Sequence, residues 1–429
     1  MNFVKEASLM GDKFTYVHHC RMCDSSDLKV VLPLTSLPIG DKYVPFEHKA
    51  QVTETFPLDI NLCQCCGHLQ NSGFVDPSMI YINYLSRPAT TNTTLSEAYK
   101  EYIDDLWVKY KRSDDVFLIE SGSNDGSFSV YAKSKGARVL GIEPSHNVAE
   151  QAEKNGVPTL CEYFTLDLAK KIKEKYGPAN FFIANHMFAN VPTSSDFIQG
   201  VKYLLADDGM LVMQTVYHVD VLKKNLIENF THEHLSYFYV KPFKGFLERH
   251  GFELIDVKRV PAKEGSIRWF IQKKNGPYQV QPSINELLTL EKEIGVEKPE
   301  TYQCTLDFIS HTKAKLHDLL DLVKANGKII AGFGTSTGAT TFSFNYSLGD
   351  MFDFFVDDDD YRHHLVSPVY HIPVLPTKTI YEKKPDYVVV LAPLYADKII
   401  QNNLEYLKQG GKFIKIWPDF KVINSVRDI

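Results

Sequence analysis

Short apolar runs alternate with amphipathic segments along the chain, and one complete unit of this pattern lies between residues 116 and 144. The apolar run 116–119 is short enough to form a fully buried strand. A small, polar turn (120–126), an Ala- and Lys-rich helical segment and a second apolar run (138–142) follow. The pattern predicts a strand–turn–helix–strand unit with Glu143 at the tip of its second strand. Such a unit binds an adenosine-containing ligand, because glycines let the backbone approach the ligand and the acid accepts the ribose hydroxyls.

The composition of the turn indicates which ligand it binds. From Glu120 to Gly126 it reads E-S-G-S-N-D-G. A dinucleotide-binding loop reads G-x-G-x-x-G, because a pyrophosphate needs several N–H groups at the start of a helix. The carboxylates of Glu120 and Asp125 would repel a pyrophosphate, but they suit a cationic sulfonium with an amino-acid tail. The turn therefore favours S-adenosylmethionine (SAM), and an ordinary crossover with a polar turn is the alternative.

The alternation of strand and helix patterns continues to residue 215. Helices are predicted at 94–110, 146–155, 166–176 and 197–205, and strands at 158–160, 179–184 and 209–215. Strands that alternate with helices are typical of an α/β fold with a doubly wound, mostly parallel sheet, which binds ligands at the carboxyl ends of its strands. Turn 120–126, Glu143 and the loop from Asn185 to Asn190 are therefore expected to share one crevice.

A second Rossmann-like unit is predicted near the C-terminus. Helices at 283–294 and 302–325 precede an apolar run and a glycine-containing loop at 328–338, and further strands are predicted at 353–356, 387–392 and 412–416. This loop carries no acid, so it could hold a diphosphate, although a purely structural loop is the alternative. Asp357 ends a strand and could reach a ribose, whereas the acidic run 357–360 is otherwise a solvated loop.

Five of the seven cysteines lie in the first segment of the chain. Two of its motifs, Cys20-x-x-Cys23 and Cys63-x-Cys65-Cys66, each allow two thiolates to point at one ion. Four thiolates make a closed tetrahedral site that suits structural zinc and leaves no open position for catalysis. Cys20, Cys23, Cys63 and Cys66 are therefore the predicted ligands, with buried free cysteines as the alternative. Cys65 is a surplus thiol, and His68 is expected to be a neighbouring polar residue rather than a ligand.

Length and charge limit the class of protein further. At 429 residues the chain is too long for one core, so two or three domains are expected. The motifs along the chain divide it into three, at 1–85, 86–282 and 283–429. The net charge of −6 argues against nucleic acid as a general partner. The sequence has no apolar run of about 18 residues, so no membrane span is expected. The first residues lack the apolar core of a secretory signal, and the odd cysteine count suits a reducing compartment, so the protein is expected to be cytoplasmic.

A further cluster of polar residues follows the fifth predicted strand, at Thr231-His232-Glu233-His234. The spacing does not match a helical zinc motif, so metal binding and a polar helix-capping turn are the alternatives here. We favour general base catalysis, because an imidazole titrates near neutrality and a nearby carboxylate can fix its tautomer. His234 is the predicted base and Glu233 the group that orients it, and His232 is expected to point away or to contact substrate.

The motifs taken together are similar to those of one family. Paired CxxC motifs precede ESGSNDGS (120–127) and GIEPSHNVAEQA (141–152), and HEHLSYF (232–238), GSIR (265–268) and GFGTSTGAT (332–340) follow. This combination resembles the SAM-dependent sugar C-methyltransferases, which methylate C3 of nucleotide-linked 4-keto-deoxysugars. The resemblance implies a zinc-binding N-terminal domain, a central SAM domain and a C-terminal Rossmann-like domain that helps to hold the nucleotide-sugar substrate.

The resemblance also assigns roles to individual residues. It makes the four cysteines zinc ligands and His234 the base. The candidate cofactor-binding residues lie in the turn, at the second strand tip, before the SAM domain and after the fourth strand: Tyr84, Glu120, Gly122, Ser123, Asn124, Asp125, Gly126, Glu143, Pro144 and Asn185.

The chain departs from the family pattern around the expected substrate. Thr231 stands where the family usually has a tyrosine, and Asn190 where it usually has a histidine, while His186 lies one turn earlier. Residues 263–264 replace His-Gly, and Gly338 replaces a lysine. His186 and Asn190 are therefore the candidate donors to an enolate oxygen. The alternatives are an O- or N-methyltransferase on a related nucleotide sugar, or a non-catalytic SAM-binding partner protein.

Overall fold

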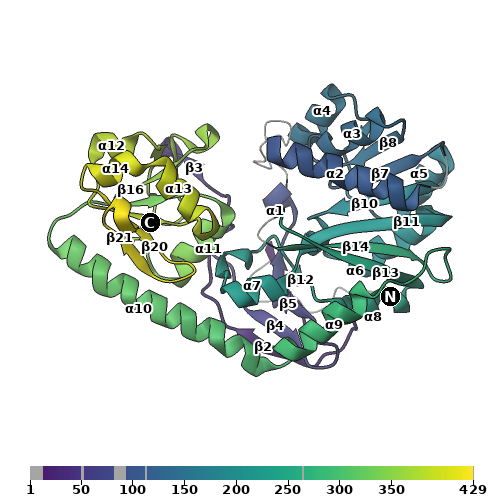
Figure 1. The fold of residues 1–429 in the computed structure, drawn as a ribbon, viewed down its shortest axis with the longest axis horizontal. Coiled ribbons are helices and arrows are strands. Elements are labelled where there is room, and N and C mark those ends of the chain that lie inside the picture. Colours follow the sequence, from purple (N-terminus) through teal and green to yellow (C-terminus); the bar gives the residue numbers. More distant parts are fainter. Residues whose placement is uncertain (1–12, 50–52, 82–92, 112–113, 263–264, 429) are drawn as a thin grey trace.

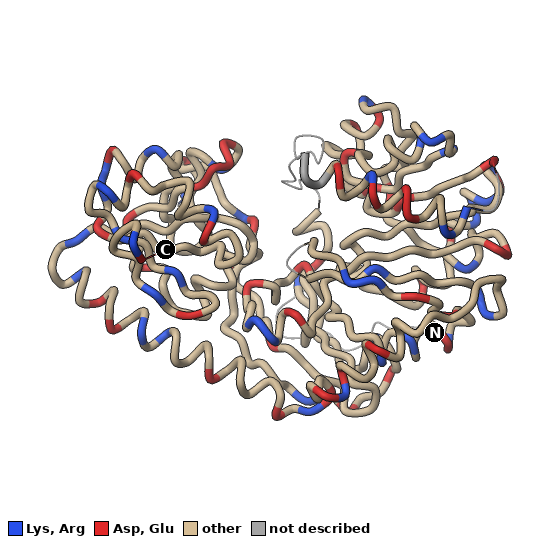
Figure 2. The backbone as a smooth tube through the Cα atoms, viewed as in Figure 1, with Lys and Arg blue, Asp and Glu red and all other residues tan. Residues whose placement is uncertain are grey.

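The computed structural model describes residues 13–49, 53–81, 93–111, 114–262 and 265–428. The chain folds into two large lobes, a central one and a C-terminal one, with a smaller N-terminal sheet at the base (Figure 1). Lys and Arg residues are interspersed with Asp and Glu residues along the backbone of both lobes (Figure 2). None of the helices in the described ranges is long and apolar enough to cross a membrane.

The central sheet has seven strands in the order β13-β14-β11-β10-β7-β8-β9. Five of them are parallel: β7 (Phe117–Ser121), β8 (Arg138–Ile142), β9 (Thr159–Leu160), β10 (Ala179–Asn185) and β11 (Leu205–Val216). The inner strands form because they contain apolar runs that are covered on both faces, whereas β9 is a short, half-buried edge strand. The predicted α/β sheet is confirmed. The antiparallel pair β13 (Phe252–Val260) and β14 (Ser266–Lys273), which was not predicted, extends it beyond β11.

Helices cover both faces of this sheet. One apolar cluster joins the strands to α2 (Thr93–Tyr110), α3 (Ser127–Ser134) and α4 (His146–Lys154). A second cluster joins the opposite face to α5 (Leu166–Tyr176), α6 (Ser194–Leu204) and α8 (Val240–Arg249). The carboxyl ends of the parallel strands stay uncovered by these layers, as the doubly wound arrangement requires.

One strand of the N-terminal sheet comes from the central part of the chain. Its order is β12-β5-β4-β2, with β2 (Leu28–Leu32), β4 (Ile60–Cys63) and β5 (Leu69–Asn71) from the first 75 residues and β12 (Ser236–Tyr237) from the segment after β11. A separate pair, β1 (Phe14–Tyr16) and β6 (Gly73–Val75), and the short α1 (Ser78–Tyr81) complete this part. The N-terminal core merges with the central core in one cluster of buried residues, so the two parts are packed together.

The C-terminal lobe is the second Rossmann-like unit. Its sheet has the order β18-β16-β15-β19-β20-β21 and is parallel except for β21 (Lys421–Ile423). The parallel strands are β15 (Ile330–Phe333), β16 (Phe354–Asp357), β18 (Val374–Pro376), β19 (Tyr387–Val390) and β20 (Lys412–Lys415), with helices α11 (Thr337–Asn345), α12 (Thr379–Lys383), α13 (Ala396–Asn402) and α14 (Leu404–Lys408).

Helices and a strand pair join the C-terminal lobe to the rest of the chain. Helices α9 (Ser283–Ile294) and α10 (Gln303–Ala325) run along the base from the central lobe to the C-terminal one (Figure 1). In addition, β3 (Val44–Pro45) of the N-terminal segment pairs with β17 (Leu365–Val366). The N-terminal segment therefore contacts both lobes.

Candidate active site

The turn between β7 and α3 is tightly folded. Gly122, Asn124 and Gly126 all have left-handed backbones, with φ of 69°, 49° and 75°. A Cβ atom on Gly122 would lie 2.8 Å from Cβ of Met187, in the loop after β10. Only glycine combines this conformation with so close an approach. The turn and the loop after β10 therefore lie against each other, as the topology predicts.

Three buried acids surround the turn: Glu120, Asp125 and Glu143 are 4%, 1% and 8% exposed. Burial raises the pKa of Glu120 to about 8; the Ser129 hydroxyl, 2.7 Å away, opposes this, and the charges of Asp125 and Glu143 add to it. Burial also raises the pKa of Glu143. Three carboxylates so close together in a desolvated site favour a cationic ligand, which lowers the cost of their ionisation.

Glu143 has the position and the acceptors that a ribose requires. It follows β8, and its two oxygens accept hydrogen bonds from the backbone N–H groups of Asn124 (3.1 Å) and Ser145 (3.0 Å). These bonds hold the carboxylate in place and leave lone pairs on both oxygens. Next to it, the carbonyl of Pro144 lies 3.7 Å from the Cys161 thiol. Tyr84 lies outside the described residues.

Several polar atoms at this edge of the sheet are buried and have no hydrogen-bond partner within the described part of the chain. They are Ser123 Oγ, Asp125 Oδ2, both amide atoms of Asn185 and Asn190 Oδ1. A buried polar group without a partner costs about 1–3 kcal/mol. Their concentration around the turn, with the three acids, fits the sulfonium, amine and ribose groups of SAM.

The segment that contains His234 lies next to the same edge. The backbone N–H of Leu235 donates to the carbonyl of Ala189, 2.7 Å away in the loop after β10. Nδ1 of His234 lies 3.2 Å from the carbonyl of Asn229. Because a carbonyl only accepts, Nδ1 carries the proton in this contact. This contact with Asn229 orients Nδ1, and the orienting role of Glu233 stays a prediction.

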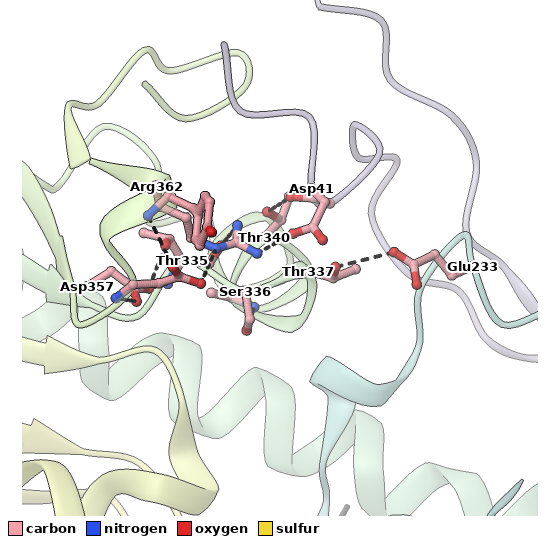
Figure 3. Close-up of polar contacts among 12 residues, drawn as sticks. Asp41, Glu233, Thr335, Ser336, Thr337, Thr340, Asp357 and Arg362 are labelled. Atoms are coloured by element: carbon pink, nitrogen blue, oxygen red, sulfur yellow. Dashed lines mark hydrogen bonds and ion pairs between the residues drawn. The ribbon is translucent and has the colours of Figure 1, made fainter. Parts of the chain in front are cut away.

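The two residues before His234 contact different domains. Nε2 of His232 lies 3.2 Å from the carbonyls of Phe56 and Pro57 in the N-terminal domain, and burial lowers its pKa to about 4. The Glu233 carboxylate accepts from the Thr337 hydroxyl, 3.4 Å away in the C-terminal lobe (Figure 3). Both domains therefore fix the segment that carries the candidate base.

Thr231 is buried beside the N-terminal sheet, and its role at the site stays a prediction. Its carbonyl accepts from the amide of Asn71 (3.0 Å), and its hydroxyl is buried without a described partner.

His218, the first residue of α7 (His218–Lys224), lies next to this segment and was not among the predicted site residues. Burial, and then the charge of His234, lower its pKa well below the usual range. Its ring packs 4.7 Å from that of Tyr237, and no sequence motif marks it.

The four cysteines of the paired motifs form one cluster. Their Sγ atoms all lie within 4.8 Å of one another, and the Cys20–Cys66 and Cys23–Cys63 pairs are 3.6 Å apart. Zinc–sulfur bonds of about 2.3 Å in a tetrahedron require sulfurs roughly 3.8 Å apart, so the cluster fits zinc. His68 instead contacts Ser236 (3.2 Å) and is not part of the cluster, as expected.

The cysteine cluster is linked to the site through Arg21, which sequence reasoning missed. Its guanidinium donates to the carbonyls of Val191 and Pro192, the latter at 2.8 Å, and to the hydroxyl of Ser236 (3.2 Å). Burial lowers the pKa of Arg21 to about 10. The structural metal site therefore supports the loop after β10.

The glycine loop of the C-terminal lobe is held by its own acid (Figure 3). The N–H and hydroxyl of Thr335 donate to one oxygen of Asp357 (2.8 and 2.6 Å), and the N–H of Asp359 donates to the other (2.8 Å). These bonds hold Asp357 against the loop, and its contact with a ribose stays a prediction. Arg362 donates to the carbonyl of Thr335 (2.7 Å) and pairs with Asp41 of the N-terminal segment (2.9 Å).

Comparison with known proteins agrees with this architecture. Residues 20–81 match the model of a zinc binding domain, residues 92–257 that of a methyltransferase domain, and residues 261–418 that of a C-methyltransferase C-terminal domain. The C-methyltransferase NovU of Streptomyces niveus is 28% identical over 417 residues, which are 97% of this chain and 99% of NovU.

Among solved structures, the plantazolicin methyltransferase BpumL with S-adenosylhomocysteine (SAH) is 12% identical, with a TM-score of 0.34, over 43% of this chain and 87% of BpumL. The magnesium protoporphyrin IX methyltransferase of Synechocystis PCC 6803, also with SAH, is 18% identical, with a TM-score of 0.32, over 42% of this chain and 83% of its own. These TM-scores are too low to support an inference.

The acidic turn, the doubly wound sheet and the four-thiolate cluster define a SAM-dependent methyltransferase with a structural zinc site. The matches run in the same order along the chain as the N-terminal, central and C-terminal parts of the structure. The C-terminal part matches the model of the C-methyltransferases, and the chain is similar along nearly its whole length to one such enzyme.

Proposed function

We propose that the protein transfers a methyl group from SAM to C3 of a nucleotide-linked 4-keto-deoxysugar through an enolate. One observation carries the proposal: the segment around His234 lies where the SAM crevice meets the glycine loop of the C-terminal lobe. Leu235 is hydrogen-bonded to the loop after β10, and Glu233 to Thr337. A substrate with a sugar at one end and a nucleotide at the other would extend across such a junction.

The C-terminal loop has features that favour a diphosphate. It leads into α11, a helix of nine residues whose N-cap is Ser336, and the N-terminus of a helix attracts anions. The guanidinium of Arg362 lies beside the same loop. The acceptor sugar would then lie toward Glu233 and His234. This assignment also agrees with the family resemblance of the GFGTSTGAT motif.

The state of His234 suits a general base. Since Nδ1 carries the proton toward Asn229, Nε2 holds a lone pair. A 4-keto group acidifies the neighbouring C3–H. Nε2 takes this proton, the C–H electron pair forms the C3–C4 double bond, and the ketone π electrons move to its oxygen. When bound, SAM supplies the methyl group that the nucleophilic C3 takes. The His234 imidazolium then returns its proton to water.

The test is His234→Asn with the exposed His311→Asn as a matched control. Loss of a general base typically lowers turnover by about 10²–10⁴-fold. We expect that loss in His234→Asn, together with loss of solvent deuterium exchange at C3 of the keto sugar, while SAM affinity and the control stay unchanged. If turnover and exchange both survive in His234→Asn, the base is another residue.

The same assay separates the alternatives. Methylation of an oxygen or nitrogen would give turnover without deuterium exchange at C3, and NMR of the product would place the methyl group on the heteroatom. A non-catalytic SAM-binding protein would release no SAH with any nucleotide sugar.

A further inference from the structure

Arg268, the last residue of the GSIR motif on β14, is a buried cation whose closest contacts are neutral side chains. It is 6% exposed, and no carboxylate of the described residues lies within 4.0 Å of its guanidinium. Its Cζ lies 3.3 Å from the centre of the Tyr102 ring. Its Nε and one terminal nitrogen donate to the side-chain oxygen of Gln214, at 3.2 and 3.1 Å. Burial of a charge without a carboxylate in contact costs free energy, and the contacts with Tyr102 and Gln214 offset part of that cost.

The contact with Arg268 fixes the orientation of the Gln214 amide. A guanidinium has only donors, so the amide oxygen must face Arg268 and the amide nitrogen must face the other way. That nitrogen lies 3.0 Å from Nε2 of His186. Because an amide nitrogen only donates, Nε2 of His186 must hold a lone pair. A neutral His186 therefore carries its proton on Nδ1.

A second contact holds His186 to the same residue. Its backbone N–H donates to the carbonyl of Gln214, 2.7 Å away. The φ of His186 is 54°, which is uncommon for a residue other than glycine. Gln214 thus fixes both the backbone and the ring of His186. If Nε2 were protonated, its N–H would face the N–H of the Gln214 amide, close to the charge of Arg268, and the two donors would repel each other.

These residues lie in one row at the carboxyl edge of the central sheet. Arg268 of β14 is paired in register with Gln214 of β11, and Gln214 with Asn185 of β10. The residue after His186, Met187, packs against Gly122 of the SAM turn. The row therefore extends from β14, next to the edge strand β13, to the crevice where a methyl acceptor would bind.

We propose that Arg268 is a positioning residue that, through Gln214, holds His186 as the neutral Nδ1–H tautomer and thereby makes it the hydrogen-bond donor to the enolate oxygen of the substrate. The identity of that oxygen rests on the proposed function, whereas the tautomer does not. An imidazole that is fixed as a donor stabilises a developing oxyanion without reorganising during the reaction.

The tautomer can be measured directly. Protein labelled with 15N-histidine is examined at about pH 7.5, near neutrality for imidazole, by long-range 15N–1H correlation NMR, and His186→Asn assigns the signal. We expect the proton on Nδ1 in the wild type. In the nearly isosteric Gln214→Glu, whose carboxylate only accepts, we expect Nε2 to become protonated. Wild-type His186 with its proton on Nε2, or a signal that Gln214→Glu leaves unchanged, would overturn the proposal.

Arg268 is tested by the same signal and by turnover. Arg268→Lys keeps the charge but loses the two-point contact, so the Gln214 amide can rotate and we expect a mixture of His186 tautomers. We expect turnover to fall by up to about 100-fold with unchanged SAM affinity, and by about 10²–10³-fold in His186→Asn. An unchanged tautomer in Arg268→Lys contradicts the role of Arg268.

The two proposals fail in different ways. If the wild type transfers no methyl group and exchanges no deuterium, the proposed function fails, and the NMR signal still decides the positioning of His186. If the wild type is active and His186→Asn retains full turnover, the proposed function stands and the donor role of His186 is overturned.

Discussion

Replacement of Glu120 by glutamine is expected to stabilise the folded protein increasingly as the pH rises. Burial raises the pKa of Glu120 to about 8 from an ordinary value of 4.5; the Ser129 hydroxyl opposes this, and Asp125 and Glu143 contribute to it. The folded state therefore holds this proton more tightly than the unfolded chain does. Folded stability is lost as the pH rises from the unfolded pKa to the folded one, at about 1.4 kcal/mol per pH unit. Over this range the loss amounts to about 5 kcal/mol.

Glutamine cannot ionise, and its oxygen can still accept the hydrogen bond of Ser129, 2.7 Å away in the wild type. The difference in unfolding free energy between Glu120→Gln and wild type should thus be small near pH 5 and grow by about 1.4 kcal/mol per unit up to pH 8. This difference in unfolding free energy is measured by urea unfolding followed by tryptophan fluorescence. Both proteins carry Trp417→Phe, so that the fluorescence comes from Trp107 and Trp269 in the central domain. The exposed Glu174→Gln is the control. A difference that stays constant with pH would refute the reasoning.

Three further predictions follow from other contacts. Removal of zinc, by a chelator or by Cys23→Ser, should unfold the N-terminal sheet and lower turnover, because β12 belongs to that sheet; fully active protein that contains no zinc by elemental analysis would contradict this. Glu143→Ala should weaken SAM binding by about 1–3 kcal/mol, since the ribose hydroxyls lose their acceptor, and calorimetry that shows unchanged affinity would place the ribose elsewhere. Arg21→Met should destabilise the protein by about 1–3 kcal/mol, because the carbonyls of Val191 and Pro192 lose a charged donor; an unchanged unfolding midpoint would be evidence against this support.

Much of the fold could be predicted because its signals are local. The apolar runs at β7 and β8, the small turn between them and the acid after β8 lie within 30 residues, and the structure has the strands there. The pair β13–β14 could not be found in the same way. Residues Ser266–Gln272 of β14 are buried on both faces, so that the strand lacks the alternation of polar and apolar positions that marks a half-exposed strand. The two residues of β12 pair with β5, about 170 positions earlier, and leave no local pattern.

The residues of the candidate site likewise fall into those that local motifs predict and those that only the folded structure brings together. The four cysteines and the acids of the turn are recognisable from motifs, because each motif places its residues within a few positions of one another. The contact from Arg268 to Gln214 to His186 depends on the register between strands that are distant in sequence. The direction of Glu233 toward Thr337 likewise depends on how the C-terminal lobe packs. Such contacts are set by tertiary packing, and spacing along the chain does not encode them.

His232 contacts the N-terminal domain and its neighbour Glu233 contacts the C-terminal domain. These two contacts limit how this protein can be recombined with its relatives. A hybrid made by exchanging a whole terminal domain would keep the central segment 228–237 of one parent and meet it with foreign contacts at the carbonyls of Phe56 and Pro57 or at the hydroxyl of Thr337. Such a hybrid would fold as three domains yet misplace its histidine. Exchange of substrate preference by domain grafting therefore requires the grafted domain and this ten-residue segment to be transferred together.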